Sequence, residues 1–205
     1  MSFKVAKFLS PTDIEAAAEG FLKEYHPDRS LPIPIEEILD LKLRINIVPI
    51  RDLFRQHNID AFFSSDFTEL SIDDEQLENR PNRARFSLAH EAGHLVLHKQ
   101  YISSLKIDNI EKWKEIVLGK GSGHADMETQ ANMFAGFLLM PTDLLGNEFD
   151  KAKVELKKHP SFESKQLPSD TVLAPFLARE IAKVFDVSEE AVQYRLINWI
   201  NSKGK

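Results

Sequence analysis

The spacing of hydrophobic positions predicts helices before and after one small sheet in the order of the chain. Near the N-terminus, Ser10 can cap a first helix, Pro11 suits its first position, and Asp13 completes a capping box. The apolar residues that follow recur every three or four positions, as the packed face of a helix requires: Ile14, Ala17, Ala18, Phe21 and Tyr25. A second short helix is expected after Pro34.

Three segments show the alternation of apolar and polar positions that is typical of strands. In residues 41–47, every second residue is leucine or isoleucine. Residues 59–64 and 68–73 predict two more strands, joined by a tight turn at Ser65 and Asp66. We therefore expect a sheet of about three strands directly before a long helix.

That long helix, residues 85–98, contains the sequence His90-Glu91-x-x-His94. Because each helical residue advances by about 100°, the two imidazoles lie one turn apart on the same side and can reach one metal ion. Glu91 points to a neighbouring sector, where it can hold a water molecule on that metal, as in zinc metallopeptidases. The alternative is a surface helix with two solvated histidines.

The residues around the motif argue against a solvated helix, because they are apolar on most sides. They include Phe86, Ala89, Gly93, Leu95, Val96 and Leu97. An unpaired buried polar group costs about 1–3 kcal/mol, so two histidines inside such a helix need partners. A shared metal ion satisfies both.

A catalytic zinc ion usually has three protein ligands, and the second apolar helix offers the third. This helix runs from Glu128 and is stopped by Pro141. Glu128 lies on the same face as Ala131 and Ala135, whose small side chains allow another helix to approach closely. Asp126 lies about 200° away and points elsewhere. The alternative for Glu128 is a solvated residue that only favours the helix dipole.

Two sequence blocks carry these residues: Arg-Phe-Ser-Leu-Ala-His-Glu-Ala-Gly-His-Leu-Val-Leu-His at 85–98 and Glu-Thr-Gln-Ala-Asn-Met-Phe-Ala-Gly-Phe-Leu-Leu-Met-Pro at 128–141. In combination they resemble the ImmA/IrrE family of metallo-endopeptidases, which are gluzincin-like. A weaker third block lies at residues 187–196. The likeness extends from about residue 35 to 195, with 101–125 and 147–170 unmatched. It implies a partner repressor that the protein cuts or regulates, within mobile elements or stress responses.

Five further residues are candidates for stabilising an oxyanion or supporting the metal ligands. They are His98, His124, Tyr101, Tyr194 and Arg195. The resemblance slightly favours Arg195, which lies in the third block. His98 follows His94 too closely to be the third histidine of a metzincin signature. A supporting or surface position suits it better.

Composition narrows the protein class. The chain of 205 residues has no cysteine, which excludes disulfides and thiolate ligands and fits a reducing cytoplasm. A net charge of -6 argues against nucleic-acid binding, which needs clustered positive charge. Neither a signal peptide nor a membrane span is expected, because no sufficiently long apolar run occurs. We expect a cytoplasmic protein whose partner is another protein.

The fold class expected from these elements is α+β: a mainly helical, zincin-like domain with a small sheet and two metal-binding helices. Residues 1–150 would form this domain, and residues 151–205 a linker and a C-terminal helical pair packed on the same core. Between the metal helices we expect a short helix at 110–118 and a glycine-rich loop at 119–124. The C-terminal pair resembles a helix-turn-helix, but Glu189 and Glu190 give its second helix the wrong charge for DNA.

The leading hypothesis is a zinc-dependent endopeptidase that cleaves a regulatory protein, with His90, His94 and Glu128 as ligands of Zn²⁺ and Glu91 as the general base. One alternative is a metal-stabilised partner that acts on a repressor by contact alone. Another is a DNA-binding regulator that uses the C-terminal helices. The sequence leaves the cut site and the oligomeric state open.

Overall fold

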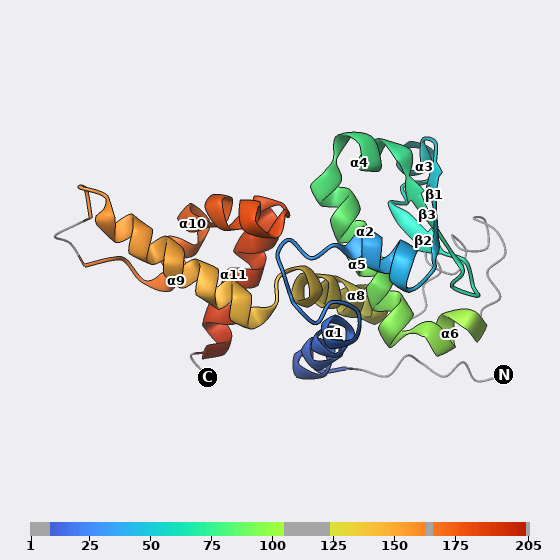
Figure 1. The fold of residues 1–205 in the computed structure, drawn as a ribbon, viewed down its shortest axis with the longest axis horizontal. Coiled ribbons are helices and arrows are strands. Elements are labelled where there is room, and N and C mark those ends of the chain that lie inside the picture. The colour runs from blue at the N-terminus through green and yellow to red at the C-terminus, as the bar shows by residue number, and fades with distance from the viewer. Residues whose placement is uncertain (1–8, 105–123, 163–165, 204–205) are drawn as a thin grey trace. The chain divides into compact units, whose positions relative to one another are not determined.

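A computed structural model describes residues 9–104, 124–162 and 166–203 and confirms a mainly helical α+β fold (Figure 1). The expected helix at 110–118 and most of the glycine-rich loop lie outside the described residues. Contacts divide the chain into two compact units, residues 1–29 with 34–138 and residues 30–33 with 139–205. The domain boundary expected near residue 150, and the packing of the C-terminal helices on the metal-helix core, stay predictions.

The first unit holds the sheet and the helices around it. Its elements are α1 (Pro11–Tyr25), α2 (Ile35–Glu37), η1 (Ile38–Lys42), β1 (Asn46–Ile50), α3 (Leu53–His57), β2 (Ala61–Phe63), β3 (Glu69–Asp73), α4 (Asp74–Asn79), α5 (Pro81–Leu97), α6 (Lys99–Ser104) and α8 (His124–Leu139).

The first helix begins as its sequence predicts. The hydroxyl of Ser10 accepts a hydrogen bond from the backbone N–H of Asp13 at 3.2 Å, and the Asp13 carboxylate accepts one from the backbone N–H of Ser10 at 3.0 Å. This capping box satisfies two of the N–H groups that a helix start leaves unpaired. The helix buries Ile14, Ala18 and Phe21, three of the five residues predicted for its packed face.

The three strands form one sheet in the order β1-β3-β2. The central strand β3 pairs with β1 in parallel and with β2 in antiparallel orientation. Both strands predicted at 59–64 and 68–73 are therefore confirmed, with shorter bounds. The turn between them uses the Asp66 carboxylate, which accepts hydrogen bonds from Ser64 and Thr68.

The strand predicted at 41–47 is wrong in its position. Leu41 lies in η1, the π-helical continuation of α2, and its side chain is 66% exposed. The π-helix ends at Lys42, and Arg44 adopts a positive φ of 57° before β1 starts at Asn46. Ile38 and Leu39 are the buried residues of η1, so only the last two positions of the predicted strand, Asn46 and Ile47, lie in β1.

The helices α5 and α8 carry the site and pack through small residues. Ala89 and Ala92 of α5 and Ala131 and Ala135 of α8 are fully buried. Phe134 of α8 meets Phe21 of α1 edge to face, with ring centroids 6.1 Å apart. Val96 is 39% exposed, so the end of α5 is less buried than its apolar sequence predicts.

The second unit consists of α9 (Thr142–Lys158), α10 (Asp170–Phe185) and α11 (Glu189–Lys203). Asp186 adopts a left-handed conformation that ends α10, and the Ser188 hydroxyl accepts a hydrogen bond from the N–H of Ala191 at the start of α11. Trp199 of α11 packs edge to face on Phe149 of α9. Across the described residues of both units, no helix is long and apolar enough to span a membrane.

Candidate metal centre

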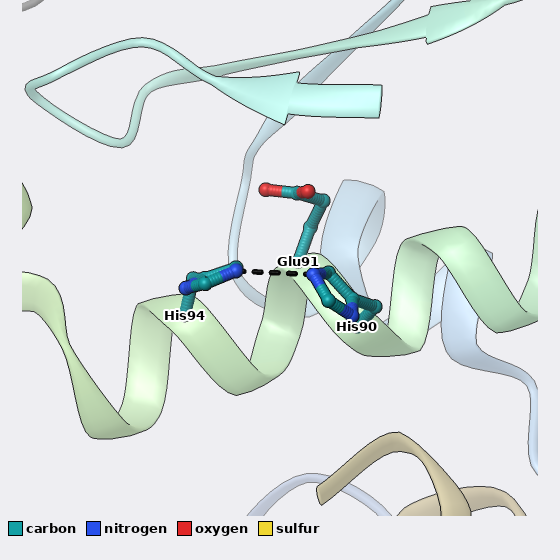
Figure 2. Close-up of side chains that lie close together, drawn as sticks. All are labelled: His90, Glu91 and His94. Carbon is teal, nitrogen blue, oxygen red and sulfur yellow. Dashed lines mark hydrogen bonds between the residues drawn. The ribbon is translucent and has the colours of Figure 1, made fainter. Parts of the chain in front are cut away.

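One helix presents three functional side chains of the motif. Within α5, His90 and His94 lie one turn apart, and their Nε2 atoms are 3.0 Å from each other. Glu91 leaves the helix in another direction, toward the strands (Figure 2). Ligand atoms of His90, Glu91 and His94 all lie within 4.8 Å of one another, so this group could hold a metal ion.

A second carboxylate reaches the same point from α8. The two oxygens of Glu128 lie 3.2 Å from His90 Nε2 and 3.2 Å from His94 Nε2. Burial raises the pKa of Glu128, but the hydrogen bonds and charges of the two histidines outweigh burial and hold that pKa well below its ordinary value. Asp126, one half-turn earlier, is exposed.

The distances from Glu128 to the two rings are compatible with a shared metal ion. In tetrahedral coordination with bonds of about 2.0–2.1 Å, ligand atoms lie about 3.3–3.4 Å apart. His90 Nε2 and His94 Nε2 are 3.0 Å apart, and each lies 3.2 Å from a different oxygen of Glu128, distances close to this requirement. Two imidazole nitrogens and the carboxylate of Glu128 could therefore hold a metal ion, with Glu91 beside them in the group formed by His90, Glu91 and His94.

The Glu91 carboxylate is 7% exposed and lies in an environment that favours its neutral form. Burial is the largest cause and raises its pKa from 4.5 to about 8, with a smaller contribution from the nearby charge of Glu128. The charge of His90 and a hydrogen bond from the backbone N–H of Phe63 act in the opposite direction. This carboxyl group can both accept and release a proton near neutral pH.

The hydrogen bond from Phe63 shows which edge of the sheet faces the site. The N–H of Ser64 donates to Glu69, and the N–H of Asp73 donates to Asp60, so residues 60, 62 and 64 bond toward β3. The N–H of Phe63 therefore points away from β3, at the outer edge of β2, and meets Glu91. The outer edge of the sheet borders the metal centre.

Polar side chains tie the start of β2 to the helices. The guanidinium of Arg83 in α5 donates to the Asp60 carboxylate at 2.7 Å. Gln76 of α4 also donates to Asp60 and accepts a hydrogen bond from the hydroxyl of Ser87 in α5. Gln76 and Ser87 are buried, so these bonds hold β2 beside the turn of α5 that carries Glu91.

The second nitrogens of the two histidine rings also have partners. His90 Nδ1 lies 2.9 Å from Asn132 Oδ1, and His94 Nδ1 lies 3.1 Å from His98 Nδ1. His98 Nε2 in turn lies 3.0 Å from Gln130 Oε1. Burial lowers the pKa of His98 to about 4, against the hydrogen bond to Gln130, so its ring is neutral at pH 7.

Sequence reasoning missed the roles of Asn132 and Gln130. Asn132 was on the predicted packing face, one turn after Glu128, and that spacing could have identified it as a partner of a histidine. Gln130 was detectable as a polar residue among Met127, Ala131 and Phe134, which are all buried. A buried amide in such a setting needs a hydrogen-bonding partner.

The other candidates lie in different surroundings. Tyr101 is half-buried in α6, directly after the motif helix. Tyr194 is 64% exposed on α11 of the second unit. Arg195, in the same helix, is buried and donates to the Met140 carbonyl at 3.1 Å and to the Thr142 hydroxyl at 3.0 Å. His124 begins α8, and its side chain lies outside the described part.

No curated protein matches the chain in sequence. A family model described as the IrrE N-terminal-like domain, a peptidase family, matches residues 75–197. This match covers more than half of the chain and includes both metal helices with all the residues of the centre. The family supports a metallopeptidase type of function. The chain belongs to the peptidase family of IrrE N-terminal-like domains.

Proposed function

We propose that this protein is a zinc-dependent endopeptidase that cleaves a regulatory protein inside the cell. The observation that carries the proposal is the meeting of His90, His94 and Glu128 at separations of 3.0–3.2 Å, beside the buried carboxyl group of Glu91. Two imidazoles and one carboxylate form the ligand set of catalytic zinc in several peptidases. The absence of cysteine is consistent with a reducing compartment.

Each residue of the centre has a separate task in this proposal. His90, His94 and Glu128 would hold the ion. Bound zinc supplies Lewis acidity, which activates water and polarises the scissile carbonyl. Glu91 accepts the proton that water loses on attacking the carbonyl, and then donates it to the leaving amine. Its pKa of about 8 before a cation binds is suited to both steps, because a cation beside it lowers that pKa toward neutrality.

The outer edge of β2 supports a peptide as the substrate. An extended peptide can add to an exposed strand through backbone hydrogen bonds, which give affinity with little dependence on side chains. The N–H of Phe63 points outward at this edge and already contacts Glu91. A peptide lying along β2 would therefore bring its backbone carbonyl groups close to the general base.

For the substrate itself, we propose a DNA-binding repressor, on the strength of the resemblance in the two motif blocks. The acidic chain favours a protein partner over a nucleic acid, since its net charge is -6. The start of α11 agrees with this, because Glu189 and Glu190 are exposed there and would repel phosphates.

The proposal is tested with Glu91→Gln, which keeps the size of the side chain and removes its ability to accept a proton. The purified variant should bind zinc as the wild type does and form a stable complex with the repressor that the wild type cleaves. Its cleavage rate should fall by about 10²–10⁴-fold, measured by mass spectrometry of the products. Glu78→Gln on α4 is the matched control, because it makes the same change at an exposed position.

Loss of repressor cleavage in Glu91→Gln but not in Glu78→Gln would support the peptidase. If zinc-loaded wild type and Glu91→Gln both leave the repressor intact and both relieve repression equally, the peptidase is excluded. The protein would then act by contact.

A further inference from the structure

The ring of His94 belongs to a chain of buried hydrogen bonds that ends on an amide. His94, His98 and Gln130 are 7%, 4% and 4% exposed. The two ring nitrogens that face each other, His94 Nδ1 and His98 Nδ1, are 3.1 Å apart, and His98 Nε2 is 3.0 Å from Gln130 Oε1. Each contact needs one donor and one acceptor, so the atom that donates in one contact determines which atom donates in the other.

The amide oxygen of Gln130 determines which atom donates and which accepts in each of these hydrogen bonds. A carbonyl oxygen only accepts hydrogen bonds, so His98 Nε2 must carry the proton in that contact. A neutral imidazole has a single N–H, which leaves His98 Nδ1 as an acceptor. His94 Nδ1 must then donate to His98. When His94 is neutral, as an imidazole that binds a metal must be, its lone pair is consequently on Nε2, the atom 3.2 Å from Glu128 and 3.0 Å from His90 Nε2.

We infer that Gln130 and His98 are positioning residues, which hold His94 in the single tautomer and ring orientation that can bind the metal. This inference rests on the proposed function, because it takes His94 as a ligand. His90 has a shorter version of the same arrangement, with Asn132 Oδ1 2.9 Å from its Nδ1. Residues that hold a metal-bound histidine in this way typically change metal affinity by 10–100-fold when they are replaced.

Gln130→Leu tests the contact between Gln130 and His98, because leucine fills a similar space and accepts no hydrogen bond. We expect its zinc affinity, measured by competition with a chelator, to fall by about 10–100-fold. Gln130→Glu retains an acceptor for the same N–H and should stay within a few-fold of wild type. His98→Phe removes the acceptor for the N–H of His94 and should lower zinc affinity as Gln130→Leu does.

The matched control is Gln76→Leu, since Gln76 is also a buried glutamine of the first unit but bonds to Ser87 and Asp60. It should lose stability in urea without losing zinc affinity. A second readout is independent of affinity: long-range ¹H–¹⁵N spectra of the zinc-loaded wild type should show protons on His94 Nδ1 and His98 Nε2.

The inference is overturned if wild type binds zinc while Gln130→Leu and His98→Phe bind it within about threefold of wild type. It is also overturned if Gln76→Leu lowers zinc affinity as much as these two variants do, or if the spectra show the opposite tautomers. If Gln130→Leu does not fold, the zinc affinity of His98→Phe and the spectra of wild type decide whether the inference holds. Failure of wild type itself to bind zinc would instead contradict the proposed function.

Discussion

Gly93 of α5 lies directly against the backbone of Ala131 in α8. A Cβ atom placed on Gly93 would lie 3.1 Å from the Cα and 3.2 Å from the carbonyl oxygen of Ala131. It would also lie 3.2 Å from the Cβ of Phe134. The helices therefore touch through their backbones at this point, one residue before His94 and three residues after Glu128. This close contact sets the distance between the histidines and the carboxylate.

Gly93→Ala should consequently lower both stability and metal affinity. Alanine favours a helix over glycine by about 1 kcal/mol, but overpacking typically costs 1–3 kcal/mol, and two of the three contacting atoms are backbone atoms. We expect a net loss of about 1 kcal/mol in the free energy of unfolding, together with weaker zinc binding as Glu128 is pushed away.

Gly20→Ala in α1 is the matched control, because nothing lies within 4 Å of its added Cβ. It should stabilise the protein by about 0.5–1 kcal/mol in urea unfolding and leave zinc affinity unchanged. If both variants are equally stabilised, the backbone contact does not constrain α5 and α8.

Glu128→Ala should abolish stoichiometric zinc binding, because it removes one of three ligand side chains. Asp126→Ala, which removes the same type of group from an exposed position two residues earlier, should keep one zinc ion per chain. Elemental analysis of the purified proteins measures both. Full zinc content in Glu128→Ala would exclude it as a ligand, and loss in Asp126→Ala would transfer that role to Asp126.

The buried carboxyl group of Glu91 should make the metal-free protein less stable as pH rises. Its pKa is raised in the folded state from 4.5 to about 8, so the folded state binds its proton more tightly than the unfolded state. This contribution to stability is complete below about pH 4.5 and is lost as pH rises toward 8, by at most about 1.4 kcal/mol per pH unit.

Glu91→Gln should remove this contribution to the pH dependence. In urea unfolding with a chelator present, the stability of the variant relative to wild type should increase from pH 5 to pH 8 and then level off. A constant difference between the two proteins over this range would show that the pKa of Glu91 is not raised by burial.

Arg195→Met should act mainly on stability. Its guanidinium donates to the Met140 carbonyl and the Thr142 hydroxyl, and a buried acceptor left unpaired costs about 1–3 kcal/mol. Arg179→Met, at an exposed position of α10, should change stability by less than about 0.5 kcal/mol. If Arg195→Met unfolds at the same urea concentration as wild type but cleaves substrate much more slowly, Arg195 takes part in catalysis.

Local signals in the sequence were sufficient for much of the fold. The capping box at Ser10 and Asp13, the turn at Asp66, and the helix around His90 and His94 each depend on neighbouring residues, so their patterns are complete within one segment. The strand predicted at 41–47 begins later, at Asn46, because residues 38–42 continue α2 as a π-helix in which Leu41 is 66% exposed. The alternation of apolar and polar residues from Leu41 does not show where that helix ends, since the sequence pattern is the same whether Leu41 is helical and exposed or lies in a strand.

The sequence by itself also determined the chemical types at the centre: two imidazoles on one helical face, a carboxylate beside them, and another carboxylate on a second helix. The tertiary structure decided which carboxylate meets both rings, because that depends on how α8 crosses α5 at Gly93 and Ala131. It also decided the parts played by Gln130, His98 and the N–H of Phe63. The contacts of Gln130 and of the N–H of Phe63 join residues that are far apart in the chain, and only packing brings them to hydrogen-bonding distance.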